Sequence, residues 1–123
     1  MDFALSEEQT AIFEMAKAFG ATKITPHARD WDAAGEIPKS LWPKLAELGF
    51  GGLYVREENG GSGLTQLDAT LVFEALSMAC PSVAAFLSIH NMCVAMIDKF
   101  GSDRLCKKYL PKALSMETFF SYC

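Results

Sequence analysis

One stretch decides the fold of this chain: residues 82–100, SVAAFLSIHNMCVAMIDKF. It contains neither glycine nor proline, while Pro81 precedes it and Gly101 follows it, so the pattern predicts one long helix that Ser82 caps. Two faces of this helix are apolar, and the third is small or polar. The third face consists of Ala84, Ser88, Asn91, Ala95 and Asp98. Such a helix lies inside a domain, and its small face admits either a neighbouring helix or the tail of a ligand.

The same helix is not expected to span a membrane. Its longest apolar run, residues 83–97, is interrupted by Ser88, His90 and Asn91 and is therefore too short and too polar for a bilayer. The chain begins with MDF and has no basic segment of the kind that opens a secretory signal. The sequence therefore predicts neither a membrane span nor a signal peptide.

The rest of the chain predicts further helices with short links. Ser6 and Gln9 have the spacing of a capping box at the start of the first helix. At Pro26 this helix either kinks or gives way to a second helix capped by Thr25. Other helix starts are expected at Ser40, at Thr65 with Asp68, and at Ser102. Helix ends are expected at Gly35, Gly49 and Gly101, and an end or a kink at Pro111. Residues 50–55 are expected to form a short extended piece. Together these elements predict an all-α domain of five to six helices over residues 1–117.

The last six residues, TFFSYC at 118–123, have a different pattern. They are β-branched, aromatic or small, which predicts a strand. A strand must pair its backbone N–H and C=O groups with a neighbour, and no later segment of this sequence offers one. We therefore expect residues 118–123 to be the first strand of a β domain that lies outside these 123 residues.

Composition excludes several classes of protein. A chain of 123 residues with 50% hydrophobic and 21% charged residues is one globular domain. Its net charge of -4 argues against a nucleic-acid partner, because phosphate binding needs a basic face. Four cysteines, Cys80, Cys93, Cys106 and Cys123, show no C-x-x-C pair and no histidine at metal-binding spacing. They predict reduced thiols and no metal site.

Three features resemble catalytic or binding motifs without completing one. His90 belongs to the residue type best suited to acid–base catalysis, but no partner is evident, so a buried structural histidine is favoured. Residues 59–63, NGGSG, lack the lysine and the spacing of a phosphate-binding loop and predict a turn. The adjacent glutamates at 7–8 and 57–58 do not resemble a catalytic pair and are expected to be solvated. The chain therefore offers no catalytic residue of its own.

Taken in order, several motifs resemble the acyl-CoA dehydrogenase family. They are MDFALSEEQ at 1–9, ITPHARDWD at 24–32, LAELGF at 45–50, EENGGSGL at 57–64 and KYLPK at 108–112. The resemblance covers the whole chain in one register. Residues 87–93, LSIHNMC, are most similar to the branch of the family that acts on isobutyryl-CoA.

This resemblance implies an architecture and a reaction. Family members have an N-terminal helical domain, a middle β domain and a C-terminal four-helix bundle, and they form homotetramers that bind FAD. They oxidise an acyl-CoA to the 2,3-enoyl-CoA, here a short branched one with isobutyryl-CoA preferred, and electron-transfer flavoprotein is their partner. The glutamate that acts as base lies in the C-terminal bundle, so this chain alone is expected to be inactive. The implied location is the bacterial cytoplasm or the mitochondrial matrix.

The resemblance also assigns a few site residues. Tyr122 and Cys123 match the first two positions of the flavin-binding stretch, while Ser88, Ile89 and Met92 match helix positions that face the acyl tail. The helical spacing agrees, since Ser88 and Met92 are one turn apart on one face. The alternative is a stand-alone, non-catalytic helical interaction module derived from this domain.

Overall fold

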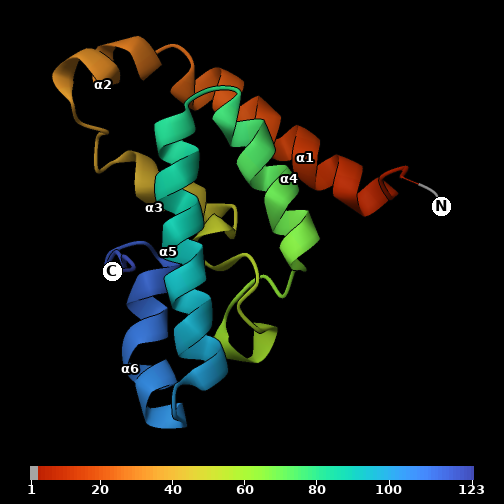
Figure 1. Ribbon diagram of the computed structural model, residues 1–123, viewed down its shortest axis with the longest axis vertical. Coiled ribbons are helices and arrows are strands. Elements are labelled where there is room, and N and C mark those ends of the chain that lie inside the picture. Colours follow the sequence, from red (N-terminus) through yellow and green to blue (C-terminus); the bar gives the residue numbers. More distant parts are fainter. Residues whose placement is uncertain (1–2) are drawn as a thin grey trace.

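The computed structural model describes residues 3–123, and within them it contains six α-helices. The helices are α1 (Glu7–Phe19), α2 (Ala28–Ala34), α3 (Leu41–Glu47), α4 (Gln66–Ser77), α5 (Pro81–Phe100) and α6 (Asp103–Leu114). Three short elements join them: a π-helical turn η1 (Gly20–Ile24) and two 3-10 turns, η2 (Phe50–Gly52) and η3 (Glu57–Asn59). Figure 1 shows α5 running through the middle of the molecule, with α1 and α4 on one side and α6 along its lower half. The predicted all-α domain of five to six helices is confirmed.

Two capping boxes start the packed pair α1 and α4. The backbone N–H of Gln9 donates to Ser6 Oγ, and the backbone N–H of Ser6 donates to Gln9 Oε1, both at 3.1 Å. Thr65 and Asp68 make the same reciprocal pair at the start of α4. Gln9 Nε2 then donates to Asp68 Oδ1 at 3.0 Å, which joins the two boxes. Both predicted caps are confirmed, and the link between them ties residues 59 positions apart.

The passage from α1 to α2 settles the alternatives at Pro26. The first helix does not stop at a Thr25 cap; it widens into η1, where the Thr25 N–H donates to the Gly20 carbonyl at 2.9 Å. The turn at residues 25–27 then leads into α2, and Gly35 ends α2 with a left-handed φ of 69°. The chain is therefore bent at this point.

Several predicted boundaries are wrong in detail. Ser40 precedes α3 but has helical backbone angles and makes no capping bond. Ser82 is not the cap of α5, because Pro81 already occupies the first helical position, where its missing N–H is not needed. Residues 50–52, predicted to be extended, form η2 because their backbone closes around a buried side chain of α5. α6 does not end at Pro111, one of the two alternatives expected there, because the helix continues to Leu114.

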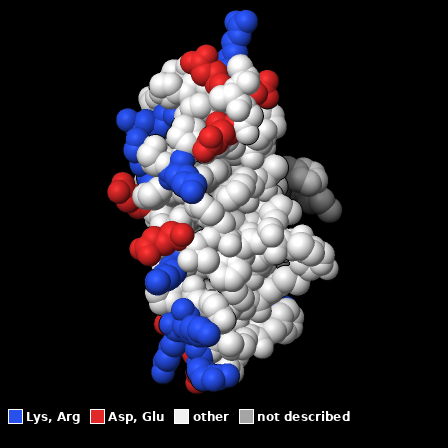
Figure 2. Space-filling view, turned by 90° about the vertical axis from the view of Figure 1, so that its left-hand side faces the viewer, with Lys and Arg blue, Asp and Glu red and all other residues white. Residues whose placement is uncertain are grey.

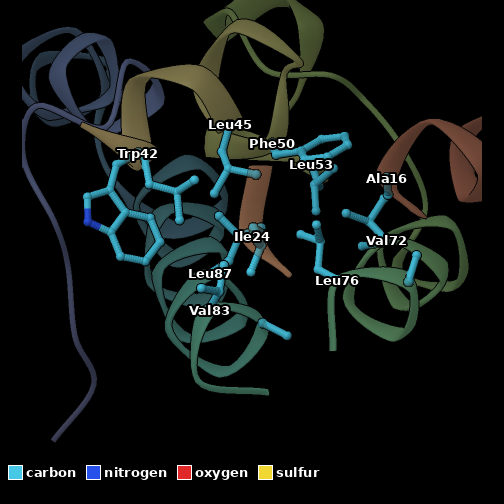
Figure 3. Packing of buried hydrophobic residues seen from close by; sticks show 14 of the residues in the cluster. Ala16, Ile24, Trp42, Leu45, Phe50, Leu53, Val72, Leu76, Val83 and Leu87 are labelled. Atoms are coloured by element: carbon cyan, nitrogen blue, oxygen red, sulfur yellow. The ribbon is translucent and has the colours of Figure 1, made fainter. Parts of the chain in front are cut away.

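Two groups of buried apolar side chains hold the helices together. The main core joins α1, η1, α3, α4 and the first half of α5, and Figure 3 shows its side chains converging. Its labelled members are Ala16, Ile24, Trp42, Leu45, Phe50, Leu53, Val72, Leu76, Val83 and Leu87. The minor core lies between the second half of α5, α6 and the loop after η2, and its members are Val55, Val94, Cys106, Leu110 and Ala113.

By length and composition alone, α5 is capable of crossing a membrane, contrary to the expectation drawn from its interrupted apolar run. In the structure it is the central helix of the domain and packs against α4, α6 and η2. It also buries three polar side chains, His90, Asn91 and Asp98, each bonded to another part of the chain. These contacts are those of a core helix.

Within residues 3–123 the structure contains no strand, so residues 118–123 do not form the strand predicted for them. The backbone N–H groups of this segment bond to helices: that of Thr118 donates to the Lys112 carbonyl of α6 at 3.0 Å, and that of Phe120 donates to His90 Nδ1 of α5 at 3.3 Å. Instead this segment, the C-terminal tail, lies near the upper end of α6 and ends at the left-hand edge of the molecule in Figure 1. Its assignment to a following β domain stays a prediction.

Candidate functional site

A groove of about 490 Å³ lies between α4 and α5. Its α5 side is built from Ala84, Ala85 and Ser88, which are small, and its α4 side includes Phe73 and Glu74. Three further residues line it: Thr70 and Ser77 of α4, and Pro81 at the start of α5. The part of the predicted small face that contains Ala84 and Ser88 therefore borders a shallow, open groove, whereas Asn91 and Asp98 of the same face are buried.

Ser88 is the predicted substrate-binding residue that lies in this α4–α5 groove. Its hydroxyl donates to the carbonyl oxygen of Ala85 at 2.9 Å, one turn earlier in α5. Because the hydroxyl is used inside the helix, Ser88 presents to the groove a small surface with little hydrogen-bonding demand. Such a wall suits an apolar group.

Ile89 and Met92 lie close to Ser88 along α5 but do not line the α4–α5 groove. Ile89 is 41% exposed and belongs to an apolar face of α5 with Phe86, Met96 and Phe100, which are also exposed. Figure 2 shows charged residues gathered along one margin of the molecule, with most of the remaining surface in this view uncharged. The structure thus separates the three predicted residues between a groove and an apolar face.

Tyr122 and Cys123, the predicted flavin-edge residues, end the C-terminal tail and are exposed. The tail is held by the aromatic residues just before them. The Phe119 ring lies edge-on to the rings of Trp42 and Phe86, with centroids 5.8 and 5.2 Å apart. These contacts place both predicted residues outside the packed domain, where another part of a protein or a ligand has access to them.

His90 is fully buried, as predicted for a structural histidine. Nε2 lies 3.0 Å from the carbonyl oxygen of Ala113, and Nδ1 lies 3.3 Å from the backbone N of Phe120. Burial lowers the pKa of His90, although hydrogen bonds to the backbone of Ala113 and Gly51 oppose the shift. Both ring nitrogens are occupied, so this side chain is not available to a substrate.

The glycine loop is a structural turn, as predicted. The N–H groups of Gly60, Gly61 and Gly63 donate to the carbonyls of Glu57, Arg56 and Val55. A phosphate-binding loop must leave such N–H groups free to point at the anion. Here they are used within the loop.

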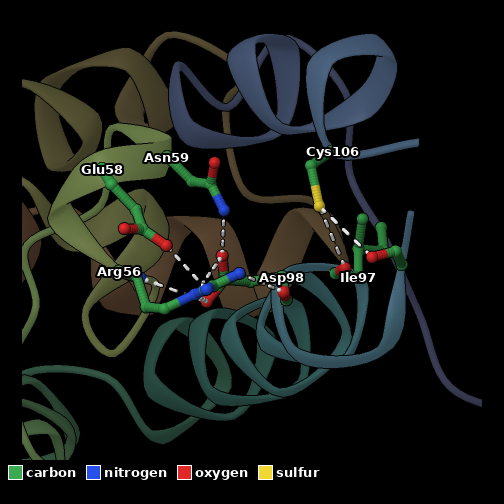
Figure 4. Close-up of polar contacts among 7 residues, drawn as sticks. Arg56, Glu58, Asn59, Ile97, Asp98 and Cys106 are labelled. Carbon is green, nitrogen blue, oxygen red and sulfur yellow. Dashed lines mark hydrogen bonds and ion pairs between the residues drawn. The ribbon is translucent and has the colours of Figure 1, made fainter. Parts of the chain in front are cut away.

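A buried carboxylate, which the sequence reasoning did not single out, anchors this loop (Figure 4). Asp98 accepts from Asn59 Nδ2 at 2.6 Å, from Arg56 Nε at 3.1 Å and from the Arg56 backbone N–H at 3.2 Å. Burial alone would raise the pKa of Asp98, but the hydrogen bonds from Asn59 and Arg56 outweigh it and lower that pKa. A lone acidic residue near the end of an apolar helix was the signal available in the sequence.

Among the described residues there is no group of three or more histidine, cysteine or acidic side chains placed to hold a metal ion. The four cysteines are free, and Cys123 is the exposed one.

These features define a class: an all-helical domain built around one long central helix, α5. The acyl-CoA dehydrogenase N-terminal domain matches residues 6–117 of the chain. The chain belongs to the acyl-CoA dehydrogenase family, as the sequence motifs indicated.

Individual members of the family are similar to this chain over nearly its whole length. The chain is 48% identical over 119 residues to the mitochondrial isobutyryl-CoA dehydrogenase of Dictyostelium discoideum and 45% identical over 119 residues to that of Bos taurus. In both comparisons the match covers 97% of this chain and 29% of the relative, so the chain spans less than a third of their length. Among solved structures, the FAD complex of PigA superposes with a TM-score of 0.88 at 32% identity, over 97% of this chain and 32% of that one.

Proposed function

We propose that this chain forms the N-terminal part of an FAD-dependent acyl-CoA dehydrogenase that oxidises a short branched acyl-CoA, preferably isobutyryl-CoA, to the 2,3-enoyl-CoA. The observation that carries the proposal is the 48% identity to an isobutyryl-CoA dehydrogenase over 97% of the chain. The α4–α5 groove is consistent with it, because it offers a small and weakly polar wall to an acyl tail.

In this proposal the chain binds the acyl tail and shapes its pocket, and the reacting groups come from elsewhere in the protein. Ser88, Ile89 and Met92 border the acyl tail and limit its length and branching. Met92 is half-buried and, being unbranched and flexible, adapts to a branched tail. Tyr122 and Cys123 contact the edge of the flavin, which fits their exposed position at the end of the C-terminal tail. When bound, FAD supplies the hydride acceptor for the β carbon.

The wider setting follows from the family. The base that removes the proton α to the thioester is a glutamate of the C-terminal bundle, outside these 123 residues. The whole protein is a homotetramer with a β domain after residue 117, passes its electrons to electron-transfer flavoprotein, and resides in the mitochondrial matrix or the bacterial cytoplasm. The mitochondrial names of the two relatives support the first location for their own lineage.

A second candidate is a non-catalytic helical interaction module. The observation that favours it is the exposed apolar face of α5, where Phe86, Ile89, Met96 and Phe100 are 37%, 41%, 43% and 75% exposed. An apolar surface of this kind marks a place where another protein surface packs. In the first proposal the other domains of the same protein cover it, whereas in the second a separate partner does.

The deciding experiment uses the protein that carries this chain. It is expected to show flavin absorbance and to reduce an electron-acceptor dye when isobutyryl-CoA is added. A Ser88→Leu variant should lose at least about tenfold in kcat/KM for isobutyryl-CoA, because added methylenes fill the groove. Ala11→Leu, on the exposed side of α1, is the matched control and should leave kcat/KM unchanged. A protein without flavin would favour the interaction module, whereas a flavoprotein that acts only on long straight-chain acyl-CoA would contradict the branched substrate alone.

A further inference from the structure

His90 connects three parts of the chain through its two ring nitrogens. It projects from the middle of α5 and is fully buried. A carbonyl oxygen can only accept, so the 3.0 Å contact between Nε2 and the oxygen of Ala113 places the ring proton on Nε2. Nδ1 is then the acceptor for the backbone N–H of Phe120, 3.3 Å away. The two bonds together require the neutral Nε2–H tautomer.

Aromatic rings surround this hydrogen bond on the side of the C-terminal tail. The ring centroids of Phe119 and Phe120 lie 6.3 and 6.4 Å from that of His90. Phe119 packs edge-on to Phe86 of α5, and Phe120 packs edge-on to Tyr109 of α6 at 6.2 Å. The two phenylalanines therefore fix the tail on different elements, with the histidine bond between them.

The start of the tail is fixed independently. The backbone N–H of Thr118 donates to the carbonyl oxygen of Lys112 in α6 at 3.0 Å. Residues 118 and 120 are thus each bonded through their backbone, one to α6 and the other to α5. Only the second of these bonds depends on a side chain, and that side chain is His90.

We propose that His90 is a positioning residue that latches the C-terminal tail to α5 by accepting the Phe120 N–H, and that it thereby sets where Tyr122 and Cys123 lie. Only two residues of extended chain, about 7 Å, separate the latched Phe120 from Tyr122. A displacement of Phe120 should therefore displace Tyr122 by a similar distance. The consequence for the flavin edge rests on the proposed function, whereas the latch itself rests on the contacts of His90.

Packing alone does not require this arrangement. A purely apolar side chain in the same volume would leave the Ala113 carbonyl and the Phe120 N–H without their present partner. The two isosteric amides separate the roles: asparagine places an oxygen near Nδ1, whereas glutamine places an NH₂ near Nε2. His90→Asn therefore keeps the acceptor for Phe120, and His90→Gln keeps only the donor to Ala113.

The test is hydrogen–deuterium exchange at the Phe120 amide in the protein that carries this chain. We expect protection of this amide in the wild type, exchange at least tenfold faster in His90→Gln, and recovery of most of the protection in His90→Asn. In the wild type, ¹⁵N shifts of His90 should report the Nε2–H tautomer, a measurement that needs no variant to fold. Unchanged Phe120 exchange in a folded His90→Gln, or a proton on Nδ1, overturns the proposal.

Flavin absorbance of the same samples separates the two proposals. A protected Phe120 amide in a protein that never binds flavin supports the latch and contradicts the proposed function. An unprotected Phe120 amide in a flavin-containing wild-type enzyme supports the proposed function and contradicts the latch. If both hold, His90→Gln should weaken flavin retention and His90→Asn should restore it.

Discussion

The two halves of α5 are built on different principles. The first half sends Val83 and Leu87 into the main core, where they pack against apolar side chains. The second half buries His90, Asn91 and Asp98, and each of these accepts from or donates to backbone groups far away in the sequence. The first half is therefore held by apolar packing, and the second half is held by hydrogen bonds.

The difference determines how each half should respond to mutation. Apolar packing is non-directional and tolerates a change of shape at constant volume. A buried hydrogen bond has a defined donor and acceptor. Removing one of them leaves the other buried without a hydrogen-bond partner. Around the second half of α5 no buried side-chain nitrogen or oxygen of the described residues lacks a partner, so any change there breaks a completed set.

The largest expected effect is at Gly51, beside the second half of α5. A Cβ added there would overlap the carbonyl oxygen of Leu114, and backbone cannot move aside cheaply. Gly51→Ala should lower the free energy of unfolding by more than about 4 kcal/mol or prevent folding. Gly35→Ala is the control, because nothing lies within 4 Å and only its φ of 69° is unfavourable, at about 1 kcal/mol. Similar denaturation midpoints for the two variants would contradict the close backbone approach.

A direct comparison of the two halves uses neighbouring turns of α5. Asn91 Oδ1 accepts from the Leu53 N–H at 2.7 Å, and its Nδ2 donates to the Phe50 carbonyl at 2.8 Å. Asn91→Leu strands both groups and should lower the free energy of unfolding by about 3 kcal/mol. Leu87→Met, in the main core, should lower it by about 1 kcal/mol. Urea denaturation measures both, and equal losses would remove the distinction between the halves.

A smaller effect is expected from acid. His90 titrates at 6.5 when unfolded, and burial lowers its pKa in the folded protein. Between these two values the unfolded state binds more protons, so the free energy of unfolding falls as the pH falls below 6.5. The hydrogen-bond and ring partners of His90 are Gly51, Ala113, Phe119 and Phe120, and none of them carries a charge.

Asp98 should add a separate loss in stronger acid. Its folded pKa lies below the ordinary 3.8, so its stabilising contribution is complete above 3.8 and is lost only as the pH falls further. Denaturation curves at a series of pH values should therefore show two steps. His90→Asn should lack the first step and keep the second, and a first step that survives this change would assign it to another group.

The smallest effects are expected at exposed helix starts that lie outside α5. Ser6 caps α1 at 3.1 Å, whereas Ser102 caps α6 with a longer contact of 3.4 Å. Ser6→Ala should cost about 1 kcal/mol, and Ser102→Ala should cost less. Thermal denaturation measures both. A loss at Ser102 as large as that at Asn91 would show that an exposed cap of α6, which packs against α5, matters as much as the buried polar groups of α5.

The parts of the fold that follow local rules were predictable from the sequence. The capping boxes at Ser6 and Thr65 and the left-handed glycines at 35 and 49 depend on neighbouring residues only, and all four are confirmed. The turn at residues 50–52 was predicted to be extended because its conformation depends on Asn91, about forty positions later. Boundaries at Ser40 and Ser82 were missed because a capping residue was present but not used.

The candidate site was predictable in composition but not in geometry. Helical spacing correctly put Ser88 on a small face of α5, yet only the fold shows that this face borders a groove against α4 while Ile89 faces outward. The sequence also could not show the partners of His90, because Ala113 and Phe120 contribute backbone groups, which every residue type possesses. A hydrogen bond to the backbone cannot be predicted from the residue type of the partner.

The bond between Gln9 and Asp68 has a consequence for how the domain loosens. Each of these side chains completes the cap of its own helix, and the 3.0 Å bond between them makes one cap the support of the other. The first turns of α1 and α4 are therefore expected to fray together, as a single cooperative unit. A protease that cuts at one of these two helix starts would then find the other already opening.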